Sequence, residues 1–363
     1  MGTIWISAAW KAPCRFSSDT VAIRLFFEKR ALKALLATPR VLRTALVRFA
    51  EPKVRRQLDP DLRLLMAISG LRPPLDALSV RNARQEFSAI IELLDVPREA
   101  VAYDHHQQLT HETGHFGVRI YRPLGVGDLA LPGVLFFHGG GHTVGRAADY
   151  DHVCRFLANR LGAVLVSVDY RLAPENRFPA AADDALAAWS WFQDQARELG
   201  VNPKRMAVMG DSAGGNLAAV VSQRAGEREM PTPRAQCLVY PTLDASRSSE
   251  SMKLYGEHLG LTRSMIDWFD HHYLGDPADA RHPMASPIRH RKLKGQPATV
   301  LTVCTDPLRD EGLDYARRLE KAGVQVDLLD YPELVHGFLC MGGMIPAARR
   351  ALLEICDTFG KML

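Results

Sequence analysis

Short apolar segments alternate with longer segments of helical pattern from Ala100 onward, and no other feature of the sequence limits the fold as strongly. Each parallel strand needs a crossover before the next one, so the alternation predicts an α/β domain with a mostly parallel central sheet flanked by helices. We expect helices over residues 183–199 and 310–322. We expect strands near Phe116–Arg122, Gly133–Phe137, Ala163–Val168, Met206–Met209, Gln236–Tyr240, Ala298–Val303 and Val326–Asp330.

The segment before this domain has a different character. The pattern over residues 21–49 is helical, with Pro39 dividing it into two helices, and Asp59-Pro60 and Gly70 mark the two ends of a third helix. Residues 1–56 hold twelve Lys or Arg against three acidic residues, a net charge of +9, so the rest of the chain carries −5. A basic helical face can contact an anionic membrane, but we favour a segment that rests on the acidic domain.

The most specific motif is Gly210-Asp211-Ser212-Ala213-Gly214-Gly215, which follows an apolar strand pattern directly and precedes a helical one. That context is typical of a nucleophile elbow, a sharp turn that presents a serine hydroxyl at the carboxyl edge of a sheet. The pattern alone arises by chance in roughly one in ten chains of this composition, so the context carries the prediction.

A second motif, His138-Gly139-Gly140-Gly141, stands directly after the expected strand at 133–137. Three glycines after a histidine arise by chance in only roughly one in two hundred such chains. Residues without side chains can direct backbone N–H groups at an oxyanion, and the N–H of Ala213 supplies a further donor. His138 itself is expected to brace the glycine loop.

A serine nucleophile needs a base, and a histidine base needs an acid that orients it. Asp306 lies just past the strand pattern at 298–303, and His336 lies in the loop after the pattern at 326–330, so the chain order is Ser, Asp, His. Asp310 is the alternative acid, although its position favours a cap or a first-turn carboxylate of the next helix.

His111-Glu112-Thr113-Gly114-His115 spells HExxH, the zinc-protease signature. That signature needs both histidines one turn apart on a helix, whereas here the glycine and the alternating residues that follow favour a hairpin turn. No other cluster has metal-ligand spacing, and no glycine-rich loop suggests a nucleotide. We therefore expect neither a metal nor a cofactor.

Further blocks match one known family. They are VDYRLAPE at 168–175, FPAA at 178–181, DPLRDE at 306–311 and HGF at 336–338. With the motifs above, the chain over roughly residues 100–363 resembles the hormone-sensitive-lipase-like carboxylesterases, family IV of the bacterial enzymes, which have the α/β-hydrolase fold. Asp211 before the serine resembles the GDSAG subgroup.

The resemblance implies Ser212 as the nucleophile, Asp306 and His336 as its partners, and the N–H groups of Gly140, Gly141 and Ala213 as the oxyanion hole. It also implies a helical cap from residues 1–95 over a catalytic domain of residues 96–363, with a possible second cap segment near 246–273. Short- to medium-chain acyl esters and a homodimer are further implications. His142 follows the three glycines, at a position where the family more often has an aromatic or aliphatic residue. It is a candidate substrate-binding residue.

We therefore expect a serine carboxylesterase that acts on a small-molecule ester through an acyl-enzyme. The same residues leave two alternatives open: a deacetylase, amidase or lactonase, and a non-catalytic receptor of similar fold. No apolar stretch approaches the length of a membrane span, no signal peptide is recognised, and the six cysteines are scattered, so we expect a cytoplasmic protein. The acidic catalytic part argues against nucleic acid as a partner.

Overall fold

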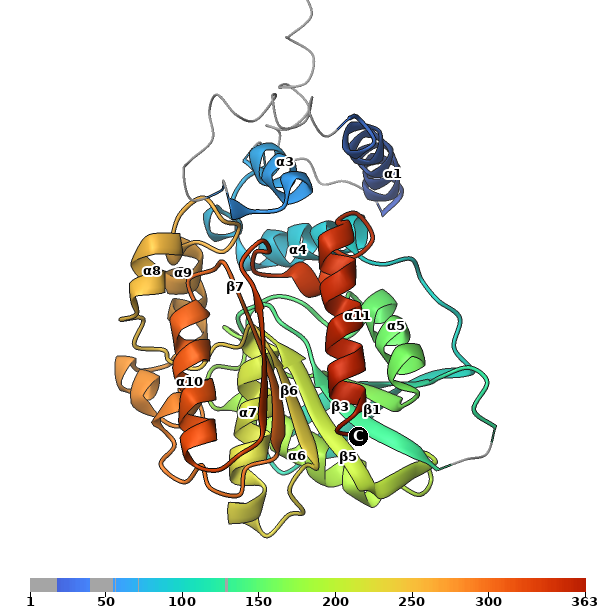
Figure 1. Ribbon diagram of the computed structural model, residues 1–363, viewed down its shortest axis with the longest axis vertical. Helices are drawn as coiled ribbons and strands as arrows, with labels where there is room; N and C mark the ends of the chain where they lie inside the picture. Colours follow the sequence, from blue (N-terminus) through green and yellow to red (C-terminus); the bar gives the residue numbers. More distant parts are fainter. Residues whose placement is uncertain (1–17, 40–54, 56, 71, 128–129) are drawn as a thin grey trace, which may run out of the picture.

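The computed structural model describes residues 18–39, 55, 57–70, 72–127 and 130–363. Its centre is a sheet of eight strands in the order β1-β2-β4-β3-β5-β6-β7-β8 (Figure 1). Strand β2 runs antiparallel to both of its neighbours, β1 and β4, and all other neighbouring pairs are parallel. The strands are β1 Tyr103–His111, β2 Gly114–Arg122, β3 Leu131–Phe137, β4 Val164–Asp169, β5 Val201–Asp211, β6 Ala235–Val239, β7 Ala298–Cys304 and β8 Val326–Tyr331.

Helices pack on both faces of this sheet, as the alternating pattern predicts. Apolar residues of α5 and α11 form one core with one face of the sheet, and those of α6, α7 and α10 form a second core with the opposite face. The strands between the two cores are buried on both sides, so they read as continuous apolar runs in the sequence. The helices are α5 Asp151–Leu161, α6 Ala180–Asp194, α7 Ala213–Arg224, α10 Arg309–Lys321 and α11 Pro346–Gly360.

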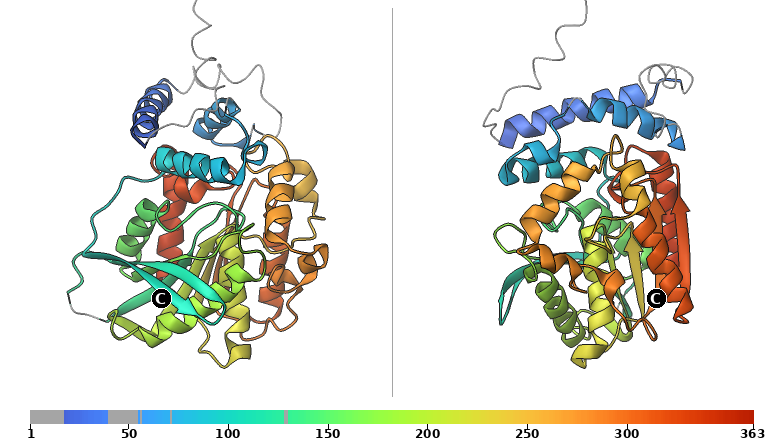
Figure 2. Two further views of the ribbon diagram at one scale, coloured as in Figure 1. Left: turned by 180° about the vertical axis from the view of Figure 1, so that it is seen from behind. Right: turned by 90° about the vertical axis from the view of Figure 1, so that its left-hand side faces the viewer.

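Further helices lie at one end of the molecule, where Figures 1 and 2 show α1, α3 and α4 stacked beside α8 and α9. Arg72, just after α3, forms ion pairs with Glu28 of α1 and Glu86 of α4, which ties the three helices together. These helices are α1 Ser18–Leu36, α3 Pro60–Ser69, α4 Val80–Leu94, α8 Glu250–Tyr255 and α9 Arg263–Tyr273.

Local signals explain where several of these helices begin. The side chain of Asp59 accepts a hydrogen bond from the N–H of Asp61, and Pro60 fills the first helical position of α3, as predicted. Ser79 and Thr262 cap α4 and α9 in the same way. The second helix expected before residue 50 lies outside the described residues. Within the part that is described, no helix is long and apolar enough to cross a membrane.

The HExxH letters lie at the hairpin between β1 and β2, where His111 pairs with Gly114 across the two strands. The two histidines are therefore not neighbours on a helix, and the predicted hairpin is confirmed. His111 instead approaches buried Asp184 of α6, at 2.7 Å between Nε2 and Oδ1. Among the described residues, no group of His, Cys, Asp and Glu has the arrangement that could hold a metal ion.

Candidate active site

Ser212 lies at the sharp turn between β5 and α7, with φ 55° and ψ −117°. This conformation is unfavourable for a residue with a side chain, and the surrounding backbone holds it in place. The Ser212 N–H donates to the carbonyl of Val239 at 2.9 Å, and the Ser212 carbonyl accepts from Asn216 and Thr242 at 3.1 Å each. The hydroxyl is therefore held at the amino end of α7, where the helix dipole favours negative charge.

Two glycines allow this turn to pack against the rest of the sheet. A Cβ on Gly214 would overlap the carbonyl oxygen of Phe137 in β3, and a Cβ on Gly210 would overlap the backbone of Gly214. Both contacts involve backbone atoms, which cannot move aside as the end of a side chain could. The motif thus needs glycine at these two positions for steric reasons.

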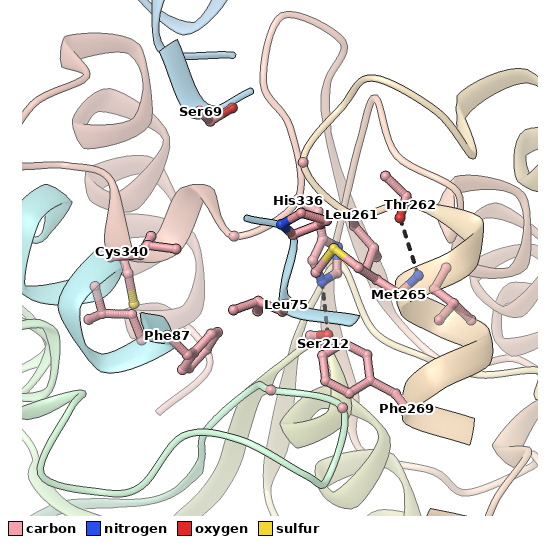
Figure 3. A pocket seen from close by; sticks show the side chains of 18 of the residues that line it. Ser69, Leu75, Phe87, Ser212, Leu261, Thr262, Met265, Phe269, His336 and Cys340 are labelled. Carbon is pink, nitrogen blue, oxygen red and sulfur yellow. Dashed lines mark hydrogen bonds between the residues drawn. The ribbon is translucent and has the colours of Figure 1, made fainter. Parts of the chain in front are cut away.

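The structure brings three of the expected residues into one hydrogen-bonded chain. His336, in the loop after β8, lies with Nε2 2.8 Å from Ser212 Oγ, the contact drawn as a dashed line in Figure 3, and with Nδ1 2.7 Å from Asp306 Oδ2. Because an ionised carboxylate can only accept, Nδ1 carries the hydrogen and Nε2 is free to accept the serine proton. This is the geometry that a nucleophile, its base and an orienting acid require.

Asp306, and not the rival Asp310, contacts the histidine. The carboxylate of Asp306 is buried, and it also accepts hydrogen bonds from the Leu308 N–H at 3.0 Å and from the Cys304 thiol at 3.3 Å. Asp310 lies in the first turn of α10 and accepts from the N–H of Ser251 at 2.7 Å. Although the two acids are only four residues apart, Asp306 faces the histidine, whereas Asp310 joins α10 to α8.

The glycine loop after β3 lies beside the serine. Gly140 and Gly141 adopt positive φ angles of 114° and 57°, which glycine adopts without strain. Within the described residues, no hydrogen bond uses the N–H groups of Gly140, Gly141 and Ala213. All three residues line the same cavity as Ser212, so these donors are available to a negatively charged oxygen.

Asp211 is an important residue of the site to which the sequence analysis assigned no role. Its buried carboxylate accepts from the N–H of Gly139 at 2.8 Å and from the hydroxyls of Tyr150 and Tyr240 at 3.2 and 3.4 Å. Burial raises the pKa of Asp211 to about 6, and the nearby His336 opposes that rise. The acid thus fixes the glycine loop to the serine turn. In the sequence, the only sign of this role is that an acidic residue stands directly before the serine.

His142 and His138 are both buried beside the glycine loop. The His142 ring stacks on Tyr273 of α9 with centroids 3.9 Å apart, and burial lowers the pKa of His142 to about 3. His142 is therefore neutral, and it contributes an aromatic face to the wall of the cavity. His138 stacks on Tyr170 at 4.3 Å, and the Tyr170 hydroxyl donates to its carbonyl, so this histidine does brace the loop.

A cavity of about 760 Å³ lies in front of Ser212 and His336. Figure 3 shows Phe269 of α9 next to the serine, and Leu75 between Phe87 and the Ser212–His336 pair. The ring of Phe269 fills the position that a Cβ on Gly141 would occupy, so α9 packs directly on the glycine loop. The sequence alone indicates α9 only as part of a possible cap segment near residues 246–273.

Comparisons with known proteins give the same picture. A family model described as alpha/beta hydrolase fold matches residues 134–340. The ethyl acetate hydrolase of Pseudomonas putida is 38% identical over 317 residues, covering 84% of this chain and 99% of the relative. The carboxylic ester hydrolase LipN of Mycobacterium tuberculosis is 41% identical over 293 residues, covering 78% of this chain and 77% of the relative.

Solved structures agree with these relatives. An esterase of Pyrobaculum calidifontis matches with a TM-score of 0.78 at 36% identity, covering 84% of this chain and 99% of that one. An ester hydrolase from the metagenome of Lake Arreo matches with a TM-score of 0.80 at 35% identity, covering 84% and 98%. Fold and site together define an α/β hydrolase. The chain belongs to the hormone-sensitive-lipase-like family of that fold, family IV, which confirms the resemblance found in the sequence.

Proposed function

We propose that this protein is a carboxylic ester hydrolase that works through an acyl-enzyme formed on Ser212. The observation that carries the proposal is the chain of hydrogen bonds from Asp306 through His336 to Ser212, which opens on a cavity lined by unused N–H donors. The names of the relatives support the ester as the bond that is cleaved.

The proposed reaction follows from the positions of these groups. Ser212 Oγ attacks the ester carbonyl while His336 Nε2 takes up its proton, and the N–H groups of the glycine loop and Ala213 stabilise the oxyanion. The C–O bond to the alcohol then breaks, and His336 returns the proton to the departing alcohol. Water attacks the acyl-enzyme by the same steps and releases the acid. Asp306 stays ionised and stabilises the protonated imidazole.

Of the two alternatives, the receptor is weaker on the same observations. A non-catalytic receptor of this fold has no need of His336 placed to deprotonate Ser212. An amidase, deacetylase or lactonase would use the same residues, so only substrates can separate it from an esterase. Paired ester and anilide substrates with the same acyl group make that comparison, and we expect the ester to be cleaved at least about a hundredfold faster.

The direct test is Ser212→Ala, which removes the attacking oxygen but leaves the cavity unchanged. We expect kcat for p-nitrophenyl acetate to fall by about 10⁴-fold or more and the burst of p-nitrophenol to disappear. Ser248→Ala, at an exposed serine away from the cavity, is the matched control and should behave as the wild type. Full activity of the Ser212→Ala protein would refute the proposal.

We also propose that residues 1–95 and the segment near 246–273 form the cap over a catalytic domain of residues 96–363. The ion pairs of Arg72 within the helices of the first segment, and the packing of Phe269 on the glycine loop, support this division. A cap remains our preferred role for the basic N-terminal segment over membrane contact. The cytoplasmic location and the homodimer stay predictions from the sequence.

A further inference from the structure

The cavity extends well beyond the groups that carry out the proposed reaction. Ser212 and His336 lie in one part of it, whereas Leu35 of α1 and Ile68 and Ser69 of α3 line another part. Figure 3 shows open space between Ser69 and the Ser212–His336 pair. We call the part between α1, α3 and α4 the distal chamber, lined by Leu32, Leu35, Leu65, Met66, Ile68 and Ile91.

The wall of the distal chamber is apolar. All six of these residues carry aliphatic or thioether side chains, and four of them are buried. The charged residues Glu28 and Arg72 also line the cavity, but they form an ion pair with each other at 2.5 Å. Among the described residues, a ligand in this chamber therefore meets mostly hydrocarbon surface, which favours an apolar group over a polar or charged one.

The volume of the cavity sets the size of that group. A methylene group takes roughly the 30 Å³ that a water molecule occupies in the liquid, so a cavity of about 760 Å³ has room for roughly 25 such groups. An acetyl group would leave most of that space unfilled. A chain of twelve carbons fills roughly half of it and leaves room for the second arm of the ester.

We propose that the distal chamber binds one long unbranched arm of the substrate, of ten or more carbons, so that the substrates are lipophilic esters beyond the short- to medium-chain range. The proposal rests on the proposed function, because it assigns a substrate class to the same site. Each methylene buried in the chamber should raise kcat/KM by about two- to fourfold, until the chamber is full.

Two substrate series test the proposal and show which arm enters the chamber. One is p-nitrophenyl esters from acetate to laurate, and the other is alkyl acetates from ethyl to dodecyl, all assayed below their critical micelle concentrations. We expect kcat/KM in at least one series to rise up to the ten-carbon member or beyond. A maximum at six carbons or fewer in both series would overturn the chamber but leave the esterase function standing. No hydrolysis in either series would overturn both.

A variant that fills the chamber ties the preference to these residues. Ile68→Trp adds bulk on the inner side of α3. In whichever series prefers long chains, the ratio of kcat/KM for the twelve-carbon over the two-carbon member should therefore fall by about tenfold or more. Ala67→Trp adds the same side chain on the exposed side of α3, outside the cavity, and should keep the wild-type ratio. Equal ratios in the two variants would place the long arm elsewhere and contradict the proposal.

A binding measurement gives a readout that does not depend on turnover. Ser212→Ala protein should bind laurate at least about tenfold more tightly than hexanoate in a calorimetric titration. Adding Ile68→Trp to it should remove most of that difference, and adding Ala67→Trp should not. Equal affinities for laurate and hexanoate in the Ser212→Ala protein would exclude the acyl arm from the chamber, and together with an alkyl acetate series that peaks at six carbons or fewer they would refute the chamber.

Discussion

At the scale of single residues, the structure shows which of two acids, Asp306 or Asp310, contacts the histidine, whereas the sequence could only favour one over the other. Asp306 contacts His336 Nδ1, whereas Asp310 accepts a hydrogen bond from the N–H of Ser251 in α8. Both follow the same strand, and the direction of each side chain depends on the turn between β7 and α10. That turn is a tertiary feature, which explains why chain order alone left the alternative open.

Asparagine at each of the two positions tests this assignment. Asp306→Asn should lower kcat by about 10³- to 10⁴-fold, because the amide can hold the imidazole in the wrong tautomer and cannot stabilise its charged form. Asp310→Asn should leave kcat within about threefold and cost about 1 kcal/mol of unfolding free energy, through the weakened bond to Ser251. Kinetics and urea unfolding of both variants check this, and a comparable loss of kcat in both would contradict it.

Other residues of the site could be predicted only in part. The serine turn and the glycine loop were recognised because each must follow a strand directly, and that requirement is visible in the sequence. The three hydrogen bonds to Asp211 and the stack of His142 on Tyr273 were not foreseen. They join segments from 29 to 131 positions apart, and no local pattern encodes such contacts.

At the scale of elements, α9 lies in the proposed second cap segment and packs against the glycine loop beside the serine. Phe269 packs on Gly141, and Asp270 holds Arg247 through two hydrogen bonds of 2.8 and 2.9 Å. Arg247 lies at the start of the same proposed cap segment, and its Nη1 is also 3.9 Å from Oε1 of Glu311 in α10, so this arginine ties α9 to the catalytic domain. We infer that α9 presses the glycine loop into the position in which its N–H groups face the serine.

Phe269→Ala tests the role of this contact. Loss of the ring should loosen the glycine loop, so kcat for p-nitrophenyl acetate should fall by about tenfold, within the effect of losing one oxyanion donor. Phe269→Leu should restore most of the kcat because it refills the space. Trp268→Ala serves as the control. It removes a larger ring from the same helix, but this ring is not among the contacts of Gly141. An equal loss of kcat in both alanine variants would point to general damage to α9.

The sequence predicted the elements unevenly, and the reasons are physical. All seven expected strands exist; six of them are largely buried and apolar, whereas β8 is only partly buried. Strand β1 was not expected, since its first six residues, 103–108, are exposed and polar. Helix α4 was also not named, although Ser79 caps it and Ala83, Phe87 and Ile91 recur at helical spacing. Helix α6 begins at Ala180 and ends at Asp194, earlier than the expected range of 183–199.

At the scale of the whole molecule, the junction between the proposed cap and the catalytic domain contains a buried acid. Asp95 ends α4, and its carboxylate accepts from the N–H of Val96 at 2.7 Å and from the N–H of Val153 in α5 at 3.2 Å. Leu94 accepts a further bond from Gly343, before α11. Burial raises the pKa of Asp95 to about 8, against which these N–H donors act. The junction therefore favours the protonated carboxyl at neutral pH.

This raised pKa makes the stability of the folded protein depend on pH. The unfolded chain releases the Asp95 proton near pH 4, whereas the folded protein keeps it up to about pH 8. The stabilisation from the bound proton is therefore complete below pH 4 and declines as the pH rises from about 4 to about 8. Between pH 5 and 7.5, the free energy of unfolding of the wild type should fall relative to that of Asp95→Asn by up to about 1.4 kcal/mol per pH unit. Urea unfolding of both proteins across this range measures the difference, and Asp314→Asn, at a half-exposed carboxylate of α10, should run parallel to the wild type. Parallel curves for the wild type and Asp95→Asn would show that the acid is already ionised in the folded protein.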